Sequence, residues 1–324
     1  MDNLTAIDLK VLNFLKLNGA HFSEREIARR LRLNQSTVNY SINKMEKMKV
    51  INSYVYRLNP ERIGLNGYAW FFFNFRNDLR SNDDIFKIVM QYPEVHVATV
   101  VSGMYDIALK IYSKDVAATN KFVMKLEKEC KDFLELTYVL YTTDIHKSYN
   151  LPFPQSDLNY NLDFADYKIL EFKMQNPNAT LTDVAKKLEM HRNTVNKRWA
   201  NLWQKNILLK KTPVIKPELN NLIGVDFRVI TLLDIDKEKK EKLVSELMKL
   251  DELHELSSVL TQHDLFGIFR TKDVNDFYSL LGKLYSNMAC GKAIKSTNSH
   301  IILKSTSQHP KLFLSKLKTL GVFS

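Results

Sequence analysis

Apolar residues recur every three or four positions over residues 6–18, and the run stops at Asn18-Gly19, which predicts a first helix. Ser23 with Glu26 three residues later is a capping-box pattern, and it opens a second predicted helix, EREIARRL. A three-residue turn follows. The third helix is predicted from about Gln35 to Met48, with Val38, Ile42 and Met45 on its buried face.

Two helices joined by a short turn, with the small Ala28 allowing close approach, are typical of a helix-turn-helix. The next segment, VINSYVYRLNP (50–60), alternates between apolar and polar residues. Alternation with a period of two is the mark of a half-buried strand, so we predict a two-strand wing here.

A third pattern follows the wing. Strands are predicted at 67–76, 95–103, 105–113 and 134–147, because these runs are rich in aromatic and β-branched residues. Helices are predicted at 82–93 and 115–130 from their apolar spacing. The resulting order, β-α-β-β-α-β, is the ferredoxin-like arrangement.

The chain then repeats itself. IARRLRLNQSTVN (27–39) and VAKKLEMHRNTVN (184–196) share five identical positions, at an offset of 157 residues. DLKVLNFL (8–15) matches DYKILEFK (166–173), and YDIALKIYSKDV (105–116) matches HDLFGIFRTKDV (263–274), both at an offset of 158. Three blocks in one order at nearly one spacing indicate two copies of one unit.

The predicted fold class is therefore α+β, with two winged helix-turn-helix domains alternating with two ferredoxin-like domains. Two prolines among polar residues mark a linker between the copies. The tail PKLFLSKLKTL (310–320) is helix-like and has no counterpart in the first copy. The predicted domains are a winged helix at 1–64, a ferredoxin-like domain at 65–147, the linker at 148–162, a winged helix at 163–221, and a ferredoxin-like domain with the tail at 222–324.

The distribution of charge along the chain indicates a function. The net charge is +11, and residues 1–64 and 163–221 each hold 11 Lys/Arg against 6 Asp/Glu, so together they contribute +10. A DNA reader needs cations on these segments, since phosphate neutralisation supplies most of its affinity. The solvated face of an ordinary helix is the alternative interpretation, and the duplicated pattern favours DNA.

The composition excludes several other classes of protein. Two cysteines are too few for a disulfide framework or a four-thiolate zinc site, and no 18-residue apolar run predicts a membrane helix. The first residues, MDNLTAIDLK, are not those of a signal peptide, so we expect a reducing, cytoplasmic location. His96 and His254 occupy equivalent strand positions, and no neighbouring residues have metal-ligand spacing, so no metal or cofactor is expected.

A winged helix followed by a βαββαβ domain resembles the Lrp/AsnC family of prokaryotic transcriptional regulators. The resemblance depends on Asp8 to Leu12, on Ile27-Ala28, Leu31 and Ser36-Thr37-Val38, and on the turn SGMYDIAL (102–109). It implies that the third helix of each copy enters the major groove of double-stranded DNA. It also implies pairing between copies of the α/β domain, within one chain or in a homo-oligomer, and an amino acid or another small effector near the glycine turn.

By position, the candidate DNA-binding residues are the outer-face residues of the two third helices. Amides suit adenine and Arg192 suits guanine, whereas hydroxyls and lysines suit phosphate. The helices differ, so an asymmetric operator is expected. The set is Gln35, Ser36, Thr37, Asn39, Tyr40, Asn43, Lys44, Lys47, Arg192, Asn193, Thr194, Asn196 and Lys197.

The effector residues implied by the resemblance are Gly103, Met104, Tyr105 and Asp106. The second copy departs from this pattern, because Thr261 stands where the glycine would be. If the backbone needs positive φ there, a threonine is strained, and the first copy is the expected effector site.

Two other interpretations stay open at this stage. The sirohaem decarboxylases resemble the same architecture, but their His-Asn-Tyr-x-Arg run is matched here only by His96. An oligomerisation adaptor that has lost DNA binding is the third class, and the basic charge on both third helices argues against it. Visible absorption by the purified protein would favour the enzyme.

Overall fold

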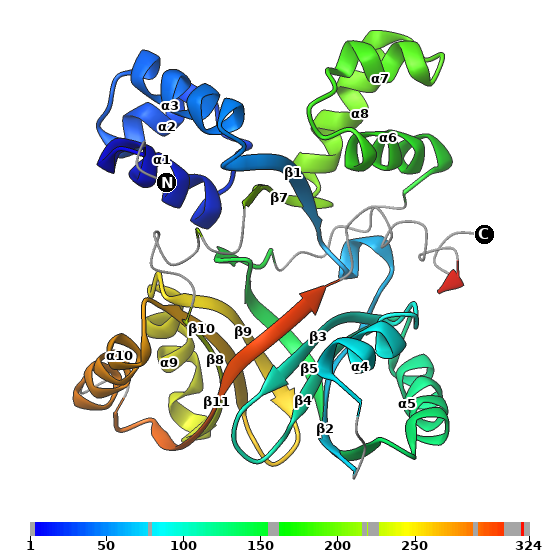
Figure 1. Cartoon of the computed structure of the whole chain (residues 1–324), viewed down its shortest axis with the longest axis vertical. Helices are drawn as coiled ribbons and strands as arrows, with labels where there is room; N and C mark the ends of the chain where they lie inside the picture. The colour runs from blue at the N-terminus through cyan, green and yellow to red at the C-terminus, as the bar shows by residue number, and fades with distance from the viewer. Residues whose placement is uncertain are drawn as a thin grey trace. The chain divides into compact units, whose positions relative to one another are not determined.

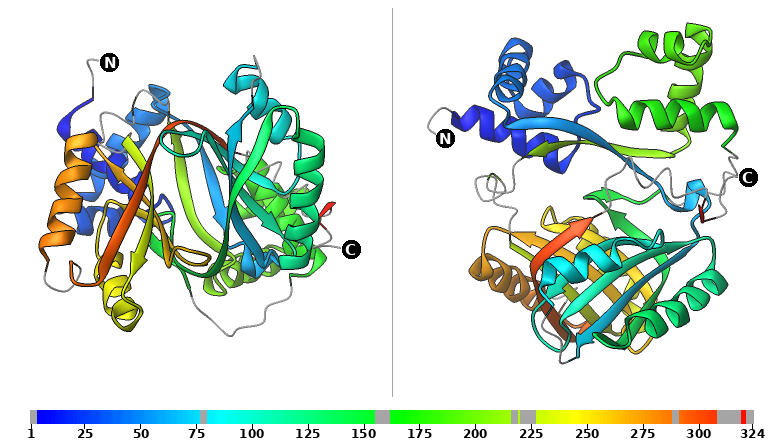
Figure 2. Two further views of the ribbon diagram at one scale, coloured as in Figure 1. Left: turned by 90° about the horizontal axis from the view of Figure 1, so that it is seen from below. Right: turned by 45° about the vertical axis from the view of Figure 1, so that its right-hand side comes forward.

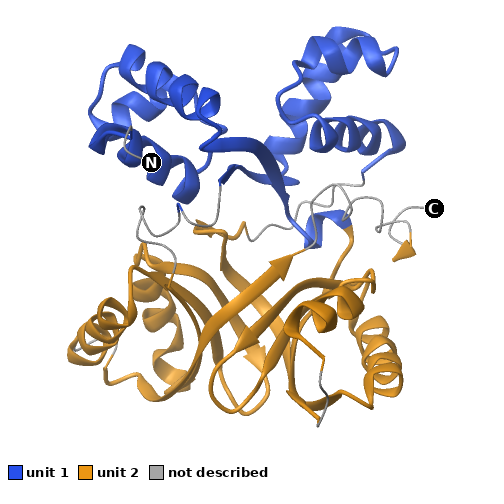
Figure 3. Ribbon diagram, in the orientation of Figure 1, with its two compact units in different colours: residues 1–63, 156–226 blue, residues 64–155, 227–324 orange. Residues whose placement is uncertain are grey.

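The computed structural model describes residues 4–76, 80–154, 162–215, 219, 227–287, 291–307 and 319–320. The α+β class is confirmed, and the described chain separates into two compact units, each built from two segments (Figures 1 and 3). Unit 1 comprises 1–63 and 156–226; unit 2 comprises 64–155 and 227–324. Like domains of the two copies thus lie in the same unit, although they alternate along the chain.

Among the described residues of unit 1, each copy has three α-helices and one strand, and a short 3-10 helix, Glu61–Ile63, follows in the first copy. Ser23 caps the second helix as predicted, and Thr5 and Thr180 close capping boxes with Asp8 and Asp183. The elements are α1 Ala6–Leu17, α2 Glu24–Leu31, α3 Gln35–Lys47 and β1 Ile51–Leu58 in the first copy, and α6 Phe164–Gln175, α7 Leu181–Lys187, α8 Arg192–Gln204 and β7 Leu208–Ile215 in the second.

The predicted two-strand wing at 50–60 is wrong. Residues 51–58 form the single strand β1, which pairs antiparallel with β7 of the other copy, for example Val55 with Thr212 (Figure 1). The alternation correctly indicated a strand, but its hydrogen-bonding partner lies about 150 residues further along the chain. Together the two strands form a two-stranded sheet that joins the two helix-turn-helix copies.

Unit 2 holds the two ferredoxin-like halves, and their predicted element order is confirmed. The helices are α4 Asn82–Val89, α5 Val116–Cys130, α9 Lys240–Met248 and α10 Val274–Ser286. The strands are β2 Gly67–Phe75, β3 Val95–Val101, β4 Ile107–Ser113, β5 Leu134–Ser148, β6 Leu151–Pro152, β8 Phe227–Ile235, β9 Leu253–Leu260, β10 Leu265–Thr271 and β11 Ile294–Ser307.

The sheet of unit 2 closes on itself. Its strand order is β2-β4-β3-β11-β8-β10-β9-β5-β6, and an additional β2–β5 pairing joins every strand except β6 into a ring. The halves meet at two seams, β3 with β11 and β5 with β9, so each long last strand reaches into the other half. The helices cover the outside of this ring (Figure 2). Closing the ring pairs sheet edges that would otherwise be exposed.

Each half of unit 2 has its own helix-covered core. Phe71 and Phe73 of β2 face α4 and α5, and Leu233 and Leu265 lie in the equivalent core of the second half. The residues that alternate with them on the strand, such as Trp70, point to the other side of the sheet, into the interior of the ring. There the Trp70 ring lies 5.0 Å, centroid to centroid, from the Phe266 ring of the other half. Aromatic side chains of the two halves therefore meet inside the ring.

Three predicted features fall partly or wholly outside the described residues: the linker at 148–162, of which 155–161 are not described, the start of the second ferredoxin-like domain at 222–226, and the tail at 310–320, of which only 319 and 320 are described. Among the described helices, none is long and apolar enough to span a membrane.

Candidate nucleic-acid interface

Helix α3 has the two faces that the sequence predicts. Val38 and Met45 are fully buried against α1 and α2, whereas Gln35, Ser36 and Tyr40 are exposed, Tyr40 to 70%. Asn34 occupies the N-cap position but its side chain makes no capping hydrogen bond. The first turn of α3 therefore presents its polar side chains outward, at the end of the helix that carries partial positive charge.

Asn39 and Asn43 are linked to α2. The Asn39 amide donates to the Glu24 carboxylate at 3.0 Å, and the Asn43 amide donates to the Asn39 side-chain oxygen. Sequence reasoning missed Glu24, because a single glutamate in the first turn of a helix is ordinary. Glu24 places a carboxylate beside Asn39, one of the candidate DNA-binding residues. A carboxylate can accept a hydrogen bond from the amino group of cytosine.

Lys44, which the sequence pattern assigns to a DNA phosphate, contacts a carboxylate of its own domain instead. Its ammonium contacts the Asp8 carboxylate at 2.7 Å, where the Ser41 hydroxyl also donates at 2.6 Å. Burial alone would raise the pKa of Asp8, but the hydrogen bonds from Lys44, Ser41 and Thr5 outweigh it and lower the pKa to about 2. Lys44 thus ties α3 to α1, and only Lys47 and the outer polar residues stay directed to solvent.

The second copy repeats this tie with other residues. Arg198 of α8 donates to Asp166 at 2.9 Å and to Asp163 at 2.7 Å, and Asp166 is the counterpart of Asp8. Arg198 stands where Ser41 stands in the first copy. In both copies a buried aspartate on the first helix therefore fixes the orientation of the third helix.

Helix α8 exposes a more basic first turn than α3. Arg192, Asn193, Thr194 and Lys197 are exposed, Asn196 is half-buried, and Val195 and Leu202 are fully buried. His191 caps the helix, its ring nitrogen accepting from the Asn193 amide at 3.3 Å. The same positions of α3 carry Gln35, Ser36 and Tyr40. The two outer faces therefore offer different hydrogen-bonding groups.

Further cations border these faces. Arg25 on α2, Arg32 in the turn before α3, and Lys186 and Lys187 on α7 are all exposed. Arg32 has a left-handed backbone, with φ of 54°, as has its counterpart Glu189. The sequence alone does not distinguish these cations from other surface residues, because only their position beside the third helix sets them apart.

The contact between the copies places the two third helices in one unit. Tyr56 of β1 packs against Trp199 of α8 at 5.3 Å, and His21 stacks on Trp203 at 4.9 Å. The Lys173 ammonium lies over Tyr56 and Trp199, and burial, with a smaller contribution from Lys211, lowers its pKa to about 8. Aromatic packing and the β1–β7 ladder together make this contact extensive.

The turn predicted to bind an effector joins β3 to β4. Gly103 has φ of 106°, and a Cβ atom there would lie 2.8 Å from the His300 ring, so only glycine fits. Tyr105 is buried among Phe72, Tyr138 and His300. The Asp106 carboxylate accepts from the Phe75 amide at 2.8 Å. The structure thus gives Tyr105 and Asp106 structural contacts, while Met104 is 66% exposed.

The second turn corrects one expectation. Asp264 accepts from the Ile235 amide at 2.9 Å, which repeats the contact of Asp106. Thr261 is not among the described residues with positive φ, so the turn is built without a left-handed residue and the expected strain does not occur. The aspartate is kept in both copies because it ties the turn to the first strand of its half.

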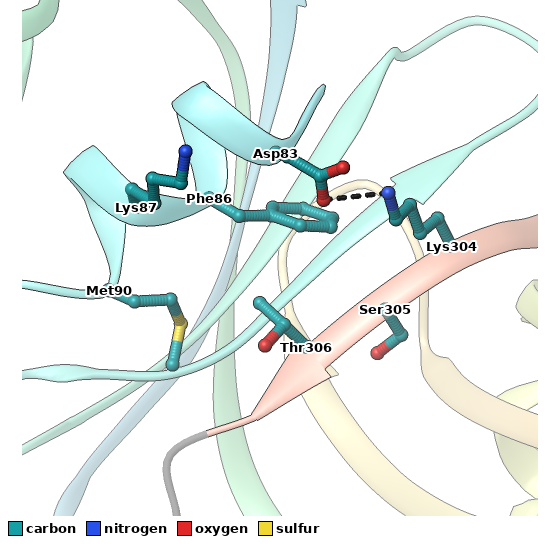
Figure 4. Close-up of a pocket in the computed structure, with 7 residues that line it drawn as sticks. All are labelled: Asp83, Phe86, Lys87, Met90, Lys304, Ser305 and Thr306. Atoms are coloured by element: carbon teal, nitrogen blue, oxygen red, sulfur yellow. Dashed lines mark hydrogen bonds and ion pairs between the residues drawn. The ribbon is translucent and has the colours of Figure 1, made fainter. Parts of the chain in front are cut away.

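A pocket of about 480 Å³ lies in unit 2 between α4 and the end of β11 (Figure 4). Phe86 and Met90 supply apolar surface, and Asp83 pairs with Lys304 at 2.6 Å across the pocket. Lys87, Ser305 and Thr306 complete the lining. None of the four residues predicted to bind an effector lines this pocket.

The two strand histidines have ordinary surroundings. His96 lies 4.9 Å from the Tyr112 ring, and His254 is hydrogen-bonded to Asn150 at 2.6 Å and to Arg270 at 3.0 Å. Within the described ranges no group of three or more His, Cys, Asp or Glu side chains could hold a metal ion. Cys130 is a buried free thiol, and Cys290 lies outside the described residues.

Comparison with known proteins agrees with this geometry. A family model described as winged helix-turn-helix DNA-binding matches residues 4–52. The chain is 31% identical over 129 residues to a proline dehydrogenase transcriptional activator of Rhodobacter capsulatus, covering 38% of this chain and 79% of that protein. It is 29% identical over 145 residues to an uncharacterized HTH-type transcriptional regulator of Pyrococcus horikoshii, covering 44% of this chain and 89% of the relative.

A solved structure extends the similarity over both copies. The siroheme decarboxylase NirDL matches with a TM-score of 0.59, covering 96% of this chain and 98% of its own, at 10% sequence identity. At that identity the match shows a shared fold and nothing about activity.

Proposed function

The chain belongs to the Lrp/AsnC family of DNA-binding transcriptional regulators, and on that premise we propose that it reads two unlike DNA half-sites, one with α3 and the other with α8. The observation that supports this most is the difference between two equivalent, exposed first turns, Gln35-Ser36 and Arg192-Asn193, held in one unit. One chain then supplies the two DNA-reading helices that a symmetric dimer would supply from two chains. Because the two helices differ, the operator of this chain is asymmetric.

Side-chain chemistry divides the proposed contacts. Gln35, Asn39, Asn193 and Asn196 can pair with adenine, and Arg192 with guanine. Ser36, Thr37, Thr194, Lys47 and Lys197 are proposed to contact phosphate, with Tyr40 and Asn43 beside them. Lys44 leaves the predicted phosphate set because its ammonium is held by Asp8. Arg25, Arg32, Lys186 and Lys187 join that set.

Replacing Arg192 by Ala should weaken binding to the selected operator by about 1–3 kcal/mol and relax one base position of one half-site, since a bidentate Arg–guanine pair contributes that much discrimination. The measurement is selection of bound sequences from a random duplex pool, followed by titration of the winning operator and its single-base variants.

The matched control is Gln35→Ala, which should relax a position in the opposite half-site. Lys168→Ala on α6 should leave the selected sequence unchanged. An Arg192→Ala protein that weakens equally on every sequence makes Arg192 a phosphate contact. Equal affinity for the two inverted repeats built from either half-site contradicts the asymmetric operator.

We propose a regulator and not an enzyme. The two relatives described above are named as a transcriptional regulator and a transcriptional activator, whereas the decarboxylase shares the fold at 10% identity. The residues after His96 do not continue the run that the resemblance to those enzymes requires. The basic faces around α3 and α8 also fit a nucleic-acid partner better than a small substrate.

We further propose that a small amino-acid effector binds in the pocket of Figure 4. Asp83 can pair with its ammonium group, Lys304 with its carboxylate, and Phe86 and Met90 with its side chain. The turn at Gly103 and Met104 is the alternative site, and it has less to offer because Tyr105 and Asp106 serve the fold.

Thermal unfolding of the full chain against single amino acids should show at least one ligand that raises the melting temperature, since a saturating ligand stabilises the state it binds. Asp83→Ala should abolish that shift and Met104→Ala should keep it. The reverse pattern would place the effector at the turn. No shift with any amino acid would remove this proposal and leave the DNA-binding proposal intact.

A further inference from the structure

A charged pair is buried inside the closed sheet of unit 2. The Lys110 ammonium of β4 contacts both oxygens of the Glu255 carboxylate of β9 at 2.8 Å, and both side chains are only 5% exposed. The Tyr68 hydroxyl also donates to Glu255. The Lys110 ammonium lies over the rings of Tyr68, Trp70 and Tyr112, at 4.9 to 5.6 Å from their centroids. The contact joins the first half to the second.

The repeat does not duplicate this pair. At an offset of 158 residues, Ile268 stands where Lys110 stands, and Val97 stands where Glu255 stands. Each half therefore contributes one charge to a place where the other half contributes an apolar residue. The surrounding strand register is closely repeated, since β3 pairs with β11 at one seam and β9 with β5 at the other.

This asymmetry matters because the two halves share one fold. A first half could therefore pair with the first half of another chain, and a second half with another second half. Two first halves from separate chains would bury two lysines, each facing Val97. Two second halves would bury two glutamates, each facing Ile268. An unpaired buried charge is strongly unfavourable, whereas a buried pair contributes little beyond a well-packed apolar pair. The pair thus discriminates between partners more than it stabilises the sheet.

We infer that the Lys110–Glu255 pair is a specificity element, which makes the surface of each half accept the other half and reject a second copy of itself. The partner that fits the interior face of the first half is a ferredoxin-like sheet with a carboxylate at the position of Glu255. Two first halves, or two second halves, do not assemble through these faces, so each ring contains one half of each kind.

Complementary variants of the full chain test this inference. Lys110→Met leaves Glu255 unpaired within one chain, and Glu255→Met leaves Lys110 unpaired. If two such chains exchange halves, two rings form: one regains the Lys110–Glu255 ion pair, and the other has an apolar Met–Met contact in its place. The two variants carry different affinity tags, are expressed together, and are purified over both tags in sequence. The double variant K110M/E255M and the wild type are prepared in the same way as tagged pairs.

The mixed complex of the two single variants should be recovered about tenfold or more above the wild-type pair, because exchange restores the charge match in both sheets. The K110M/E255M pair should stay near the wild-type level, because no charge is left unpaired in either chain and the two halves of one chain meet at a higher effective concentration than halves of separate chains. Single variants that aggregate alone but are rescued by co-expression support the inference equally. Recovery of the mixed complex at the wild-type level overturns it.

Discussion

Raising the salt concentration from 50 to 200 mM should lower the affinity of the full chain for duplex DNA by about 10³-fold. Each neutralised phosphate contributes a slope of about −0.9 to the dependence of log K on log salt, so about six contacts give this loss. The structure supplies the cations: Lys47, Arg25 and Arg32 beside α3, and Arg192, Lys197, Lys186 and Lys187 on and beside α8.

Fluorescence anisotropy with the selected operator and with a random duplex, at five or more salt concentrations, measures this slope. Lys47→Gln with Lys197→Gln should reduce the slope by about two on both duplexes, as expected for phosphate contacts. Lys168→Gln is the matched control, because this lysine lies on α6, outside the proposed DNA-contacting set.

Two results would contradict the DNA-binding proposal. One is an affinity that does not change with salt. The other is the absence of binding at 50 mM together with a saturable change in visible absorption when an iron porphyrin is added, which would favour the enzyme interpretation.

Lys110→Met should lower the free energy of unfolding of the full chain by about 3–5 kcal/mol, and Glu255→Met should have a similar effect. Either change leaves the other charge inside the ring, where water cannot solvate it. For Lys110→Met the attraction to three aromatic rings is lost as well. Urea unfolding followed by tryptophan fluorescence and by circular dichroism measures both variants.

The double variant K110M/E255M separates two contributions to the free energy of unfolding: the destabilisation by an unpaired buried charge, and the stabilisation by the ion pair itself. Its stability should return to within about 1–2 kcal/mol of the wild type, because two apolar side chains of similar length pack in the same space. Lys87→Met, which removes an exposed lysine, should change stability by less than about 1 kcal/mol. A double variant as unstable as the sum of the single variants would show that the pair itself stabilises the fold.

Some of the architecture was readable from local pattern alone. The spacing of apolar residues predicts the helices of unit 1, and Ser23 caps α2 as its distance from Glu26 predicts. The Asn34 side chain makes no capping hydrogen bond, and the capping role of Thr180 was not predicted. The repeat is visible because Ala28, Leu31 and Thr37 recur at one spacing. The buried positions Val38 and Met45 and the exposed positions Gln35 and Ser36 follow from the period of the third helix.

The candidate sites were only partly readable. Spacing identifies which residues face outward, but Lys44 and Lys47 are both polar positions of the same helix, and only the tertiary structure shows that Asp8 holds Lys44. In the same way, Asp106 and Tyr105 resemble ligand contacts by position, whereas their hydrogen bonds and packing belong to the fold.

Local sequence pattern is enough to predict the two copies, the kinds of element and their order, and the placement of positive charge on the helix-turn-helix segments. These properties depend on residues close together in the chain. Which strands and charges pair is visible only in the folded chain: β1 with β7, β3 with β11, and Lys110 with Glu255. Periodicity reports which face of an element is apolar and carries no information about its partner, which is fixed by contacts between residues more than a hundred positions apart.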